Sequence, residues 1–237
     1  MSRPLVRLVA RTEPVIGEAE AKSGSPFVVT PDEFVAFVAR VSNPSNQANK
    51  KTAPKLLRYL REHQHWSPFE MAHAVIEINT TRDIARQILR HRSFSFQEFS
   101  QRYSSEIEFA EPREARLQDP ANRQNSIEIG KDDSSDASVN YLRGRWPAMQ
   151  SEVMRVAQEA YSTAIAAGIA KEVARSVLPE GLTLSRLYVA GSLRSWIHYI
   201  DLRTGNGTQK EHRLIAEECR TVLAGAFPGI FASEVAV

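Results

Sequence analysis

The residues best suited to chemistry lie in one short stretch of the chain, from Gln87 to Tyr103. Within thirteen residues it carries three guanidiniums, an imidazole, a carboxylate and two hydroxyls, interleaved with phenylalanines. These polar residues are Arg90, His91, Arg92, Ser95, Glu98, Ser100 and Arg102. Guanidiniums bind phosphate through paired hydrogen bonds, and aromatic rings offer flat surfaces for stacking. A nucleotide is therefore the first ligand to consider.

A simpler interpretation of this run is that it is a solvated basic segment at the C-terminal end of a helix, where it opposes the helix dipole. Ser100 has no assignable base, so we interpret it as a phosphate ligand and not as a nucleophile. The chain contains neither a GxGxxG motif after a strand nor a P-loop motif. Phosphates would therefore be held by side chains and isolated helix N-termini, outside a Rossmann or P-loop site.

The order of these residues favours the specific interpretation. Arg90-His91-Arg92, seven residues, and then Ser100-x-Arg102 resembles the RHR-x7-S-x-R signature of the flavin-dependent thymidylate synthases at every defined position. Three further blocks resemble that family in the same order: HQHWSPFE, KEVARSVLP and SLRSWIHYIDLR. The resemblance extends over roughly residues 34–225.

The resemblance implies roles for particular residues. Arg203 would contact the uracil ring and is the candidate catalytic residue. The substrate dUMP would contact Gln87, Arg90, Glu98, Ser100, Gln101, Arg102 and Arg175. The cofactor FAD would contact His65, Ser67, Arg90, His91, Arg92, Glu98, Ser192, Arg194 and His198. No residue is assigned to a metal, because the histidines at 63, 65 and 73 lack the spacing of a ligand set.

At four positions the chain departs from the family pattern. Met71 and Gly207 stand where family members often carry histidine, and Ser192 and His198 replace the usual asparagines. Serine and histidine both form hydrogen bonds, so contacts to the flavin remain possible at the last two positions.

The implied reaction is the reductive methylation of dUMP to dTMP. Methylenetetrahydrofolate would donate the one-carbon unit, reduced FAD the hydride, and NADPH the electrons that re-reduce the flavin. Cys219 is a poor nucleophile because it lies in phase with an apolar helical face. Electrostatic activation of the uracil by a fixed cation then remains, and Arg203 is our candidate for it.

Two other functions are considered. A basic and aromatic segment at 82–103 could stack single-stranded RNA, although no pattern of a known RNA-binding module accompanies it. A different flavin-dependent enzyme of pyrimidine nucleotides is the second alternative. The family resemblance implies a homotetramer with active sites shared between subunits.

The length, composition and net charge of the chain exclude several classes of protein. The chain has 237 residues, 42% hydrophobic content and a net charge of +2, which argues against broad coating of nucleic acid. One cysteine excludes an intramolecular disulfide, and we expect a reducing cytoplasm. The N-terminal residues lack a long apolar run, and no segment has the apolar length of a membrane span. We expect a single catalytic domain over residues 1–237.

The elements that position the site follow from periodicity. Alternation predicts strands at residues 5–10, 71–80 and 182–189. Helical spacing predicts a helix after a Thr30–Glu33 capping box, one around residues 56–60, one starting at Thr81 and one over 193–202. The helix that starts at Thr81 would end in the RHR triplet. A capping box at Thr208 and Glu211 predicts the start of a last helix.

Between these elements the sequence changes character. Residues 112–140 are polar and predict a long, mobile excursion without a part in the chemistry. A helix follows, and its apolar stripe from Trp146 to Ala164 is expected to be buried. A shorter helix then ends at Pro179. Long helices around a small mixed or antiparallel sheet predict an α+β fold, not a Rossmann fold.

Overall fold

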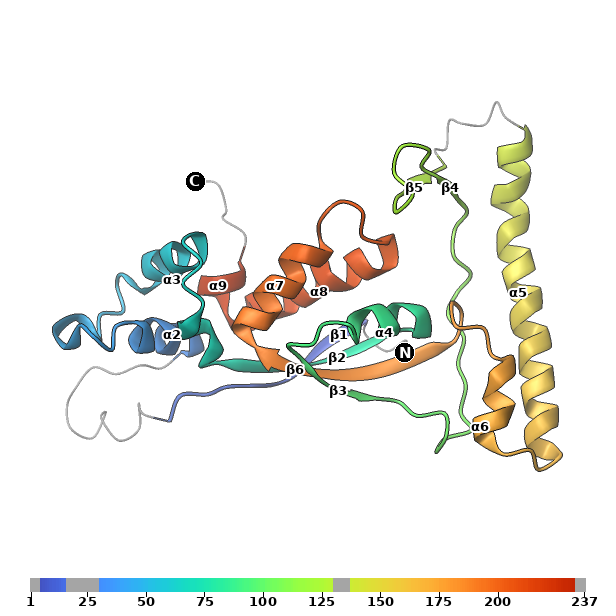
Figure 1. Cartoon of the computed structure of the whole chain (residues 1–237), viewed down its shortest axis with the longest axis horizontal. Coiled ribbons are helices and arrows are strands. Elements are labelled where there is room, and N and C mark those ends of the chain that lie inside the picture. Colours follow the sequence, from blue (N-terminus) through green and yellow to red (C-terminus); the bar gives the residue numbers. More distant parts are fainter. Residues whose placement is uncertain (1–4, 16–29, 130–136, 233–237) are drawn as a thin grey trace.

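The computed structural model describes residues 5–15, 30–129 and 137–232, and a four-stranded antiparallel sheet lies at its centre (Figure 1). The strand order is β1-β2-β6-β3, with every neighbouring pair antiparallel. The strands are β1 (Val6–Arg11), β2 (His73–Thr81), β3 (Ser95–Glu98) and β6 (Leu184–Ser192). The α+β prediction is confirmed, and each predicted strand agrees with an observed one to within a few residues.

The two central strands owe their place to alternating apolar residues. Ala74, Ile76 and Ile78 of β2 are at most 1% exposed, as are Leu187 and Val189 of β6. Their shared face is buried, while the residues between them point to the other face of the sheet. Ile76 pairs with Val189 and Ile78 with Leu187, so apolar side chains meet across the strands.

Helices cover the buried face of the sheet, where they complete the core (Figure 1). Trp196 and Ile197 of α7 are at most 1% exposed, and the indole Nε1 of Trp196 donates to the carbonyl of Ala74 at 3.2 Å. Cys219 of α8 belongs to the same core, as its spacing predicted. These helices are α4 (Arg82–Ile88), α7 (Leu193–Arg203) and α8 (Lys210–Ala226).

A second group of helices packs beside them, at the left of Figure 1. The capping box predicted at the start of α2 is confirmed: Glu33 N donates to the Thr30 hydroxyl, and Glu33 Oε2 accepts from Thr30 N. Asp32 accepts from Gly229 N at 2.9 Å, which joins α2 to α9. The helices are α2 (Pro31–Ala39), α3 (Ala53–Glu62) and α9 (Pro228–Phe231).

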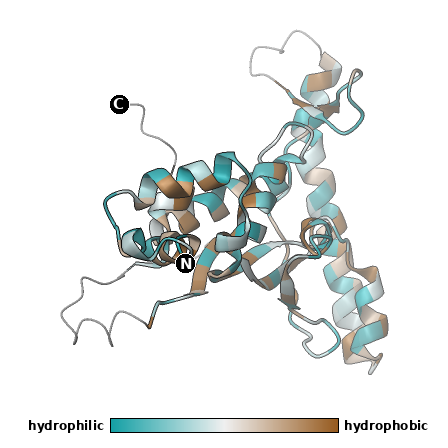
Figure 2. Ribbon diagram, turned by 60° about the vertical axis from the view of Figure 1, so that its left-hand side comes forward, coloured by the Kyte–Doolittle hydropathy of each residue, from teal (hydrophilic) through white to brown (hydrophobic). Residues whose placement is uncertain are grey.

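A long helix, α5 (Ala137–Ala166), stands apart at the right of Figure 1 and packs through its C-terminal part on α6 (Lys171–Ala174). The expectation that its whole apolar stripe is buried is wrong within this chain. Tyr161 is 2% exposed, but Met149 and Val153 are about half exposed. Figure 2 shows apolar residues recurring along the helix. Within the part of the chain that the structure describes, the C-terminal turns pack on α6, and Gln150 in the middle of the helix exchanges hydrogen bonds with the backbone of Arg113 at 2.8 and 2.9 Å.

The polar excursion between 112 and 140 has more structure than its composition predicted. It contains a hairpin of β4 (Arg116–Gln118) and β5 (Ser126–Glu128), and residues 130–136 lie outside the described part. Arg113 forms a double hydrogen bond with Asp83, at 2.9 Å for each nitrogen. The Lys210 Nζ lies 2.6 Å from both Glu114 and Glu128. Ion pairs therefore hold the excursion on α4 and α8.

The segment after the RHR triplet also forms an element that periodicity did not predict. Residues Ser95–Glu98 become edge strand β3 on β6. The phenylalanines inside the basic run explain the turn before it. Phe94 is 7% exposed and its ring lies 4.5 Å from that of Trp196. Burial of this ring anchors the turn to the core.

Close packing at Gly191 generates a stability prediction. A Cβ on Gly191 would lie 2.3 Å from Cδ1 of Phe94, so the ring must move. We expect Gly191→Ala to lower the free energy of unfolding by about 1–3 kcal/mol, as measured by urea denaturation. Gly144→Ala is the control, because no atom lies within 4 Å of its Cβ and the site is helical. It should be neutral or stabilising, and equal effects at both positions would contradict the packing assignment.

Candidate functional site

The turn that carries the RHR triplet faces α7 across an open cavity of about 850 Å³. Four arginines line it: Arg90, Arg92, Arg194 and Arg203. Asp201 is the carboxylate in the lining, and it is already paired with Arg61 at 2.8 Å. An excess of cations over carboxylates in a cavity of this size suits an anionic ligand of nucleotide dimensions.

A hydrogen bond between Arg203 and His91 joins the two walls of this cavity. Nε of Arg203 donates to Nε2 of His91 at 2.9 Å. Burial, together with the neighbouring Arg203 and His198, lowers the pKa of His91 to about 4. The imidazole is therefore neutral at pH 7, with Nε2 as acceptor and the proton on Nδ1. The terminal nitrogens of Arg203 form no hydrogen bond within the described chain, so the guanidinium can bind a ligand.

Aromatic packing fixes His91 in this position. Its ring lies 5.0 Å from the ring of Tyr199 in an edge arrangement, and Phe94 lies on another side at 6.3 Å. Tyr199 and Trp196 are both fully buried on α7. The RHR turn and the helix that ends in Arg203 are therefore held by one aromatic cluster.

The N-terminus of α7 carries two further predicted residues, Ser192 and Arg194, of which Arg194 lines the cavity. Ser192 caps the helix by accepting a hydrogen bond from Ser195 N, and Arg194 lies 2.9 Å from Glu70. Desolvation alone would raise the pKa of Glu70, but hydrogen bonds from Ser192 and Arg194 hold this pKa below its ordinary value. Glu70 belongs to the HQHWSPFE block, and its pairing with Arg194 is a tertiary contact that no local pattern predicts.

His65 and Ser67 lie beside the cavity lining, which includes their neighbours Gln64 and Trp66. The His65 ring is 6.0 Å from Tyr59, edge to face. Ser67 begins a 3-10 turn (Ser67–Glu70), and the predicted strand follows this turn as β2.

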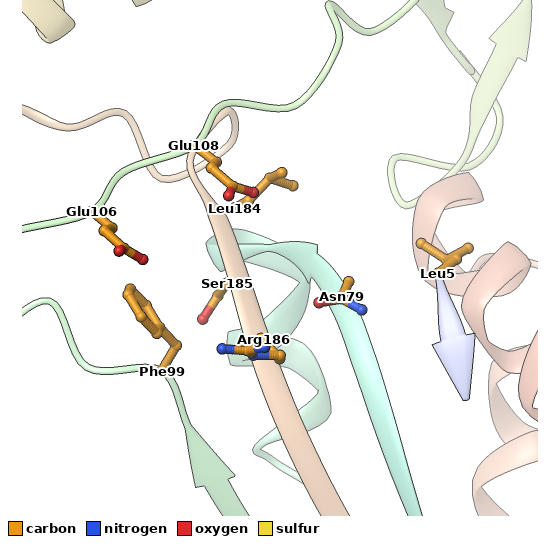
Figure 3. A pocket seen from close by; sticks show the side chains of 8 residues that line it. All are labelled: Leu5, Asn79, Phe99, Glu106, Glu108, Leu184, Ser185 and Arg186. Atoms are coloured by element: carbon orange, nitrogen blue, oxygen red, sulfur yellow. The ribbon is translucent and has the colours of Figure 1, made fainter. Parts of the chain in front are cut away.

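A second group of predicted residues surrounds the far end of β3. Glu98 accepts a hydrogen bond from Ser185 at 2.9 Å. The next residue, Phe99, lines a pocket of about 350 Å³ with Glu106 and Arg186 (Figure 3). Figure 3 shows the Glu106 carboxylate and the Phe99 ring on one side of β6.

Within this second group, some polar atoms lack a hydrogen-bond partner in the described chain, and others have only an exposed one. Gln101 is 2% exposed and accepts from Arg82 at 3.0 Å, but its amide nitrogen is buried without a partner in the described chain. Arg102 forms an exposed ion pair with Glu172 at 3.3 Å, which a stronger anion could replace. Ser100 accepts from Arg102 N. Arg175 lies on the 3-10 turn that follows α6.

The strand register separates the two groups. Glu98 pairs with Leu187 of β6, whereas Ser192 lies at the opposite end of that strand. The seven residue steps from Ser185 to Ser192 span roughly 23 Å in an extended strand. One chain therefore gathers Arg90, His91, Arg92, Ser192, Arg194, His198 and Arg203 at one end, and Glu98, Ser100, Gln101 and Arg102 toward the other.

Gln87 lies next to the first group but faces α8. Its Nε2 donates to Gln209 at 2.8 Å, and its Oε1 lies 3.1 Å from Nδ1 of His212. The sequence did not predict Gln209, Glu211 and His212 as parts of this region. The predicted Thr208–Glu211 capping box is wrong, because Gln209 caps α8 without a side-chain bond and Glu211 binds Arg116.

The structure shows the conformation of Gly207 and the exposure of Met71, two positions at which the chain departs from the family pattern. Gly207 has a φ of +86°, a left-handed conformation that favours glycine over histidine. Met71 is 53% exposed. Cys219 is fully buried, and burial raises the pKa of its thiol, so it is no nucleophile.

Comparisons with known proteins agree with the family resemblance of the sequence. A family model described as thymidylate synthase complementing protein matches residues 28–229. The chain is 46% identical to a flavin-dependent thymidylate synthase of Synechocystis sp., over 96% of this chain and 98% of that protein. It is 45% identical to a probable flavin-dependent thymidylate synthase of Paramecium bursaria Chlorella virus 1, over 94% and 95%.

A solved structure gives the same result for the fold. The UMP/dUMP methylase PolB from Streptomyces cacaoi, bound with 5-Br dUMP, superposes with a TM-score of 0.73 at 26% identity. The alignment covers 95% of this chain and 92% of that one.

The buried neutral histidines generate a prediction about pH. His91 and His212 have pKa values of about 4 and about 3, below the ordinary 6.5, mainly because of burial. At a pH between the folded-state pKa and the ordinary value of 6.5, the unfolded chain binds a proton on each histidine that the folded chain does not bind. The free energy of unfolding therefore falls as the pH is lowered through this range. Lowering the pH from 7 to 5 should reduce the free energy of unfolding by about 2 kcal/mol for each of the two histidines.

The variant His91→Gln keeps an acceptor for Arg203 but does not titrate. Urea denaturation at pH 7 and pH 5 should show a pH dependence smaller by about 2 kcal/mol in this variant. An unchanged pH dependence would show that His91 is already protonated, or titrates normally, in the folded protein.

Proposed function

The chain belongs to the flavin-dependent thymidylate synthase family, and we propose from this premise that it methylates dUMP to dTMP. The observation that carries the proposal is the cavity in which Arg203 of α7 and neutral His91 meet the two arginines of the RHR turn. A ligand there must be anionic and planar enough to lie among aromatic and imidazole rings.

FAD is the cofactor, and the cavity lining fits it. Guanidiniums of Arg90, Arg92 and Arg194 can neutralise its diphosphate, since the sequence contains neither a GxGxxG nor a P-loop motif for that purpose. Imidazoles of His91 and His198 and the side chain of Trp66 can border its ring. We also assign His65, Ser67, Glu98 and Ser192 to flavin binding. When bound, reduced FAD supplies the hydride, and we propose NADPH as the reductant that regenerates it.

The reaction replaces the hydrogen on C5 of uracil by a methyl group, so C5 must become nucleophilic. Cys219 is buried and protonated and cannot add to C6. We assign the activation to Arg203, whose fixed cation stabilises the negative charge that develops on the ring. His91 accepts from Nε of Arg203 and thereby orients the rest of the guanidinium. Methylenetetrahydrofolate is the proposed one-carbon donor.

The phosphate and sugar of dUMP are assigned to the second group of residues. Arg102 would exchange its exposed partner Glu172 for phosphate, and Ser100 and Arg175 would add further donors. The unpartnered amide nitrogen of Gln101 supports a polar ligand at this place. Gln87, Arg90 and Glu98 complete the proposed contacts.

We propose that a homotetramer brings the two groups together. Within one chain the ends of β6 hold them apart, and a neighbouring subunit could supply the missing set. The exposed apolar stripe on α5 supports such an assembly, because contiguous apolar surface favours burial in an interface. Its members include Trp146, Met149, Val153 and Val156.

No helix among the described residues has the length and apolar character needed to cross a membrane. We propose a cytoplasmic location on a different ground: the nucleotide, folate and NADPH that the reaction consumes are metabolites of that compartment.

The function is tested by release of tritium from C5-labelled dUMP, measured together with oxidation of NADPH. We expect release that depends on methylenetetrahydrofolate and on bound flavin. The solved UMP/dUMP methylase supports a second candidate substrate, so C5-labelled UMP is assayed in parallel. Release from UMP alone would replace the proposed substrate, and colourless protein without activity on either nucleotide would refute the flavin enzyme.

Arg102 and Arg203 should affect the kinetics in different ways. A phosphate contact acts about equally in the ground and transition states, so Arg102→Ala should chiefly raise the KM for dUMP. Arg203→Ala should lower kcat by on the order of a hundredfold or more, about 2–4 kcal/mol, as for the loss of one oxyanion donor. Arg203→Lys should restore only part of the rate, because an ammonium lacks the planar fork.

Flavin absorbance checks that both variants still bind the cofactor. If Arg203→Ala retains a near-normal kcat with saturating dUMP, the activation role of Arg203 is wrong.

The assembly is tested with a charge on the apolar stripe. Val153 is 50% exposed within one chain, so Val153→Glu should disturb the fold little but should weaken a helix interface. Light scattering should show a tetramer for the wild type and smaller, inactive species for the variant. Gln158→Glu, which adds the same charge on another face of α5, should remain tetrameric. An active monomer would refute shared active sites.

A further inference from the structure

Four polar side chains next to the RHR turn form a continuous hydrogen-bonded chain from the core to the surface. The hydroxyl of Tyr199 lies 3.2 Å from Nε2 of His212, and Nδ1 of His212 lies 3.1 Å from Oε1 of Gln87. Nε2 of Gln87 donates to Gln209 at 2.8 Å. His212 and Tyr199 are fully buried, so the hydrogen bond between them is shielded from water.

A carboxylate at the outer end fixes which side chain donates and which accepts along this series of hydrogen bonds. Gln209 Nε2 donates to Oε2 of Glu211 at 3.0 Å, and Arg116 from the hairpin binds the same carboxylate. Burial alone would raise the pKa of Glu211, but the hydrogen bonds from Arg116 and Gln209 reverse this and keep it ionised. An ionised carboxylate only accepts hydrogen bonds, so the amide of Gln209 must turn its nitrogen toward Glu211.

Each orientation then determines the next. With its nitrogen on Glu211, Gln209 offers its oxygen to the Gln87 nitrogen. The Gln87 oxygen consequently faces His212, which must carry its proton on Nδ1. Burial and the nearby Arg203 and His91 lower the pKa of His212 to about 3, in agreement with a neutral ring whose Nε2 accepts from Tyr199. His212 is thus unsuited to acid–base chemistry at neutral pH.

We propose that His212 and Gln209 are positioning residues that hold the Gln87 amide in one orientation, so that its second N–H is a fixed donor to an oxygen of the nucleotide. This inference rests on the proposed function, in which Gln87 contacts dUMP. A free glutamine amide can present either its oxygen or its nitrogen, and a fixed one favours a ligand with an acceptor at that point. Through Arg116, the hairpin of the excursion supports the same orientation.

A double-mutant cycle tests whether His212 acts through Gln87. The dissociation constant of dUMP is measured by calorimetry on the flavin-loaded wild type, Gln87→Leu, His212→Leu and the double variant. Each single change should weaken binding roughly three- to tenfold, the effect of one hydrogen bond. The double variant should bind no more weakly than Gln87→Leu alone, because the lost contact is the same.

A matched cycle serves as the control. Arg102 contacts neither His212 nor Gln87 in the described chain, so the effects of His212→Leu and Arg102→Ala should multiply. His212→Asn retains a donor at the position of Nδ1 and should bind dUMP within about twofold of the wild type. If His212→Leu does not fold, Gln209→Leu replaces it in the first cycle.

The outcomes separate the inference from the proposed function. Multiplied effects of Gln87→Leu and His212→Leu, or a His212→Asn variant as weak as His212→Leu, would show that His212 only stabilises the fold and would overturn the positioning role. A flavin-loaded wild type that does not bind dUMP would instead refute the proposed substrate, and the inference with it.

Discussion

Repulsion between like charges is the constraint on which the rest of this structure depends. Four guanidiniums line one cavity, and the nearest carboxylates are already paired with Arg61 and Arg194. A protonated His91 would be a further positive charge and would add to the repulsion, and the imidazole is instead neutral and accepts from Arg203. The cavity therefore keeps unsatisfied positive charge for a ligand, and the remaining fold must hold the arginines together in its absence.

The sheet and its helices meet this requirement through the aromatic cluster. Phe94 packs on Trp196 and fits only because Gly191 has no side chain, and Tyr199 packs on His91. The RHR turn follows α4, while Arg203 ends α7, so burial of these rings joins two segments more than a hundred residues apart. Hydrophobic burial thus offsets the electrostatic cost of the site.

Much of this organisation is predictable from the sequence, and the failures have physical reasons. Motif spacing identified the arginines, and alternation identified the central strands, because both are local patterns. Strand β3 was missed since four residues between arginines carry little periodicity. The apolar stripe of α5 was expected to be buried, yet periodicity alone does not show whether its packing partner lies within the same chain. The series of hydrogen bonds that links Tyr199 to Glu211 depends on tertiary contacts between α4, α7 and α8 that no local pattern encodes.

A crystal structure of the flavin-loaded protein with dUMP tests the central assignment most directly. We expect the flavin diphosphate to contact Arg92 or Arg194 and the uracil ring to lie within hydrogen-bonding distance of Arg203. Phosphate should lie on Arg102 and Arg175 of a neighbouring subunit. A flavin bound outside the cavity of the RHR turn and α7, or a uracil ring remote from Arg203, would contradict the assignment of this cavity as the active site.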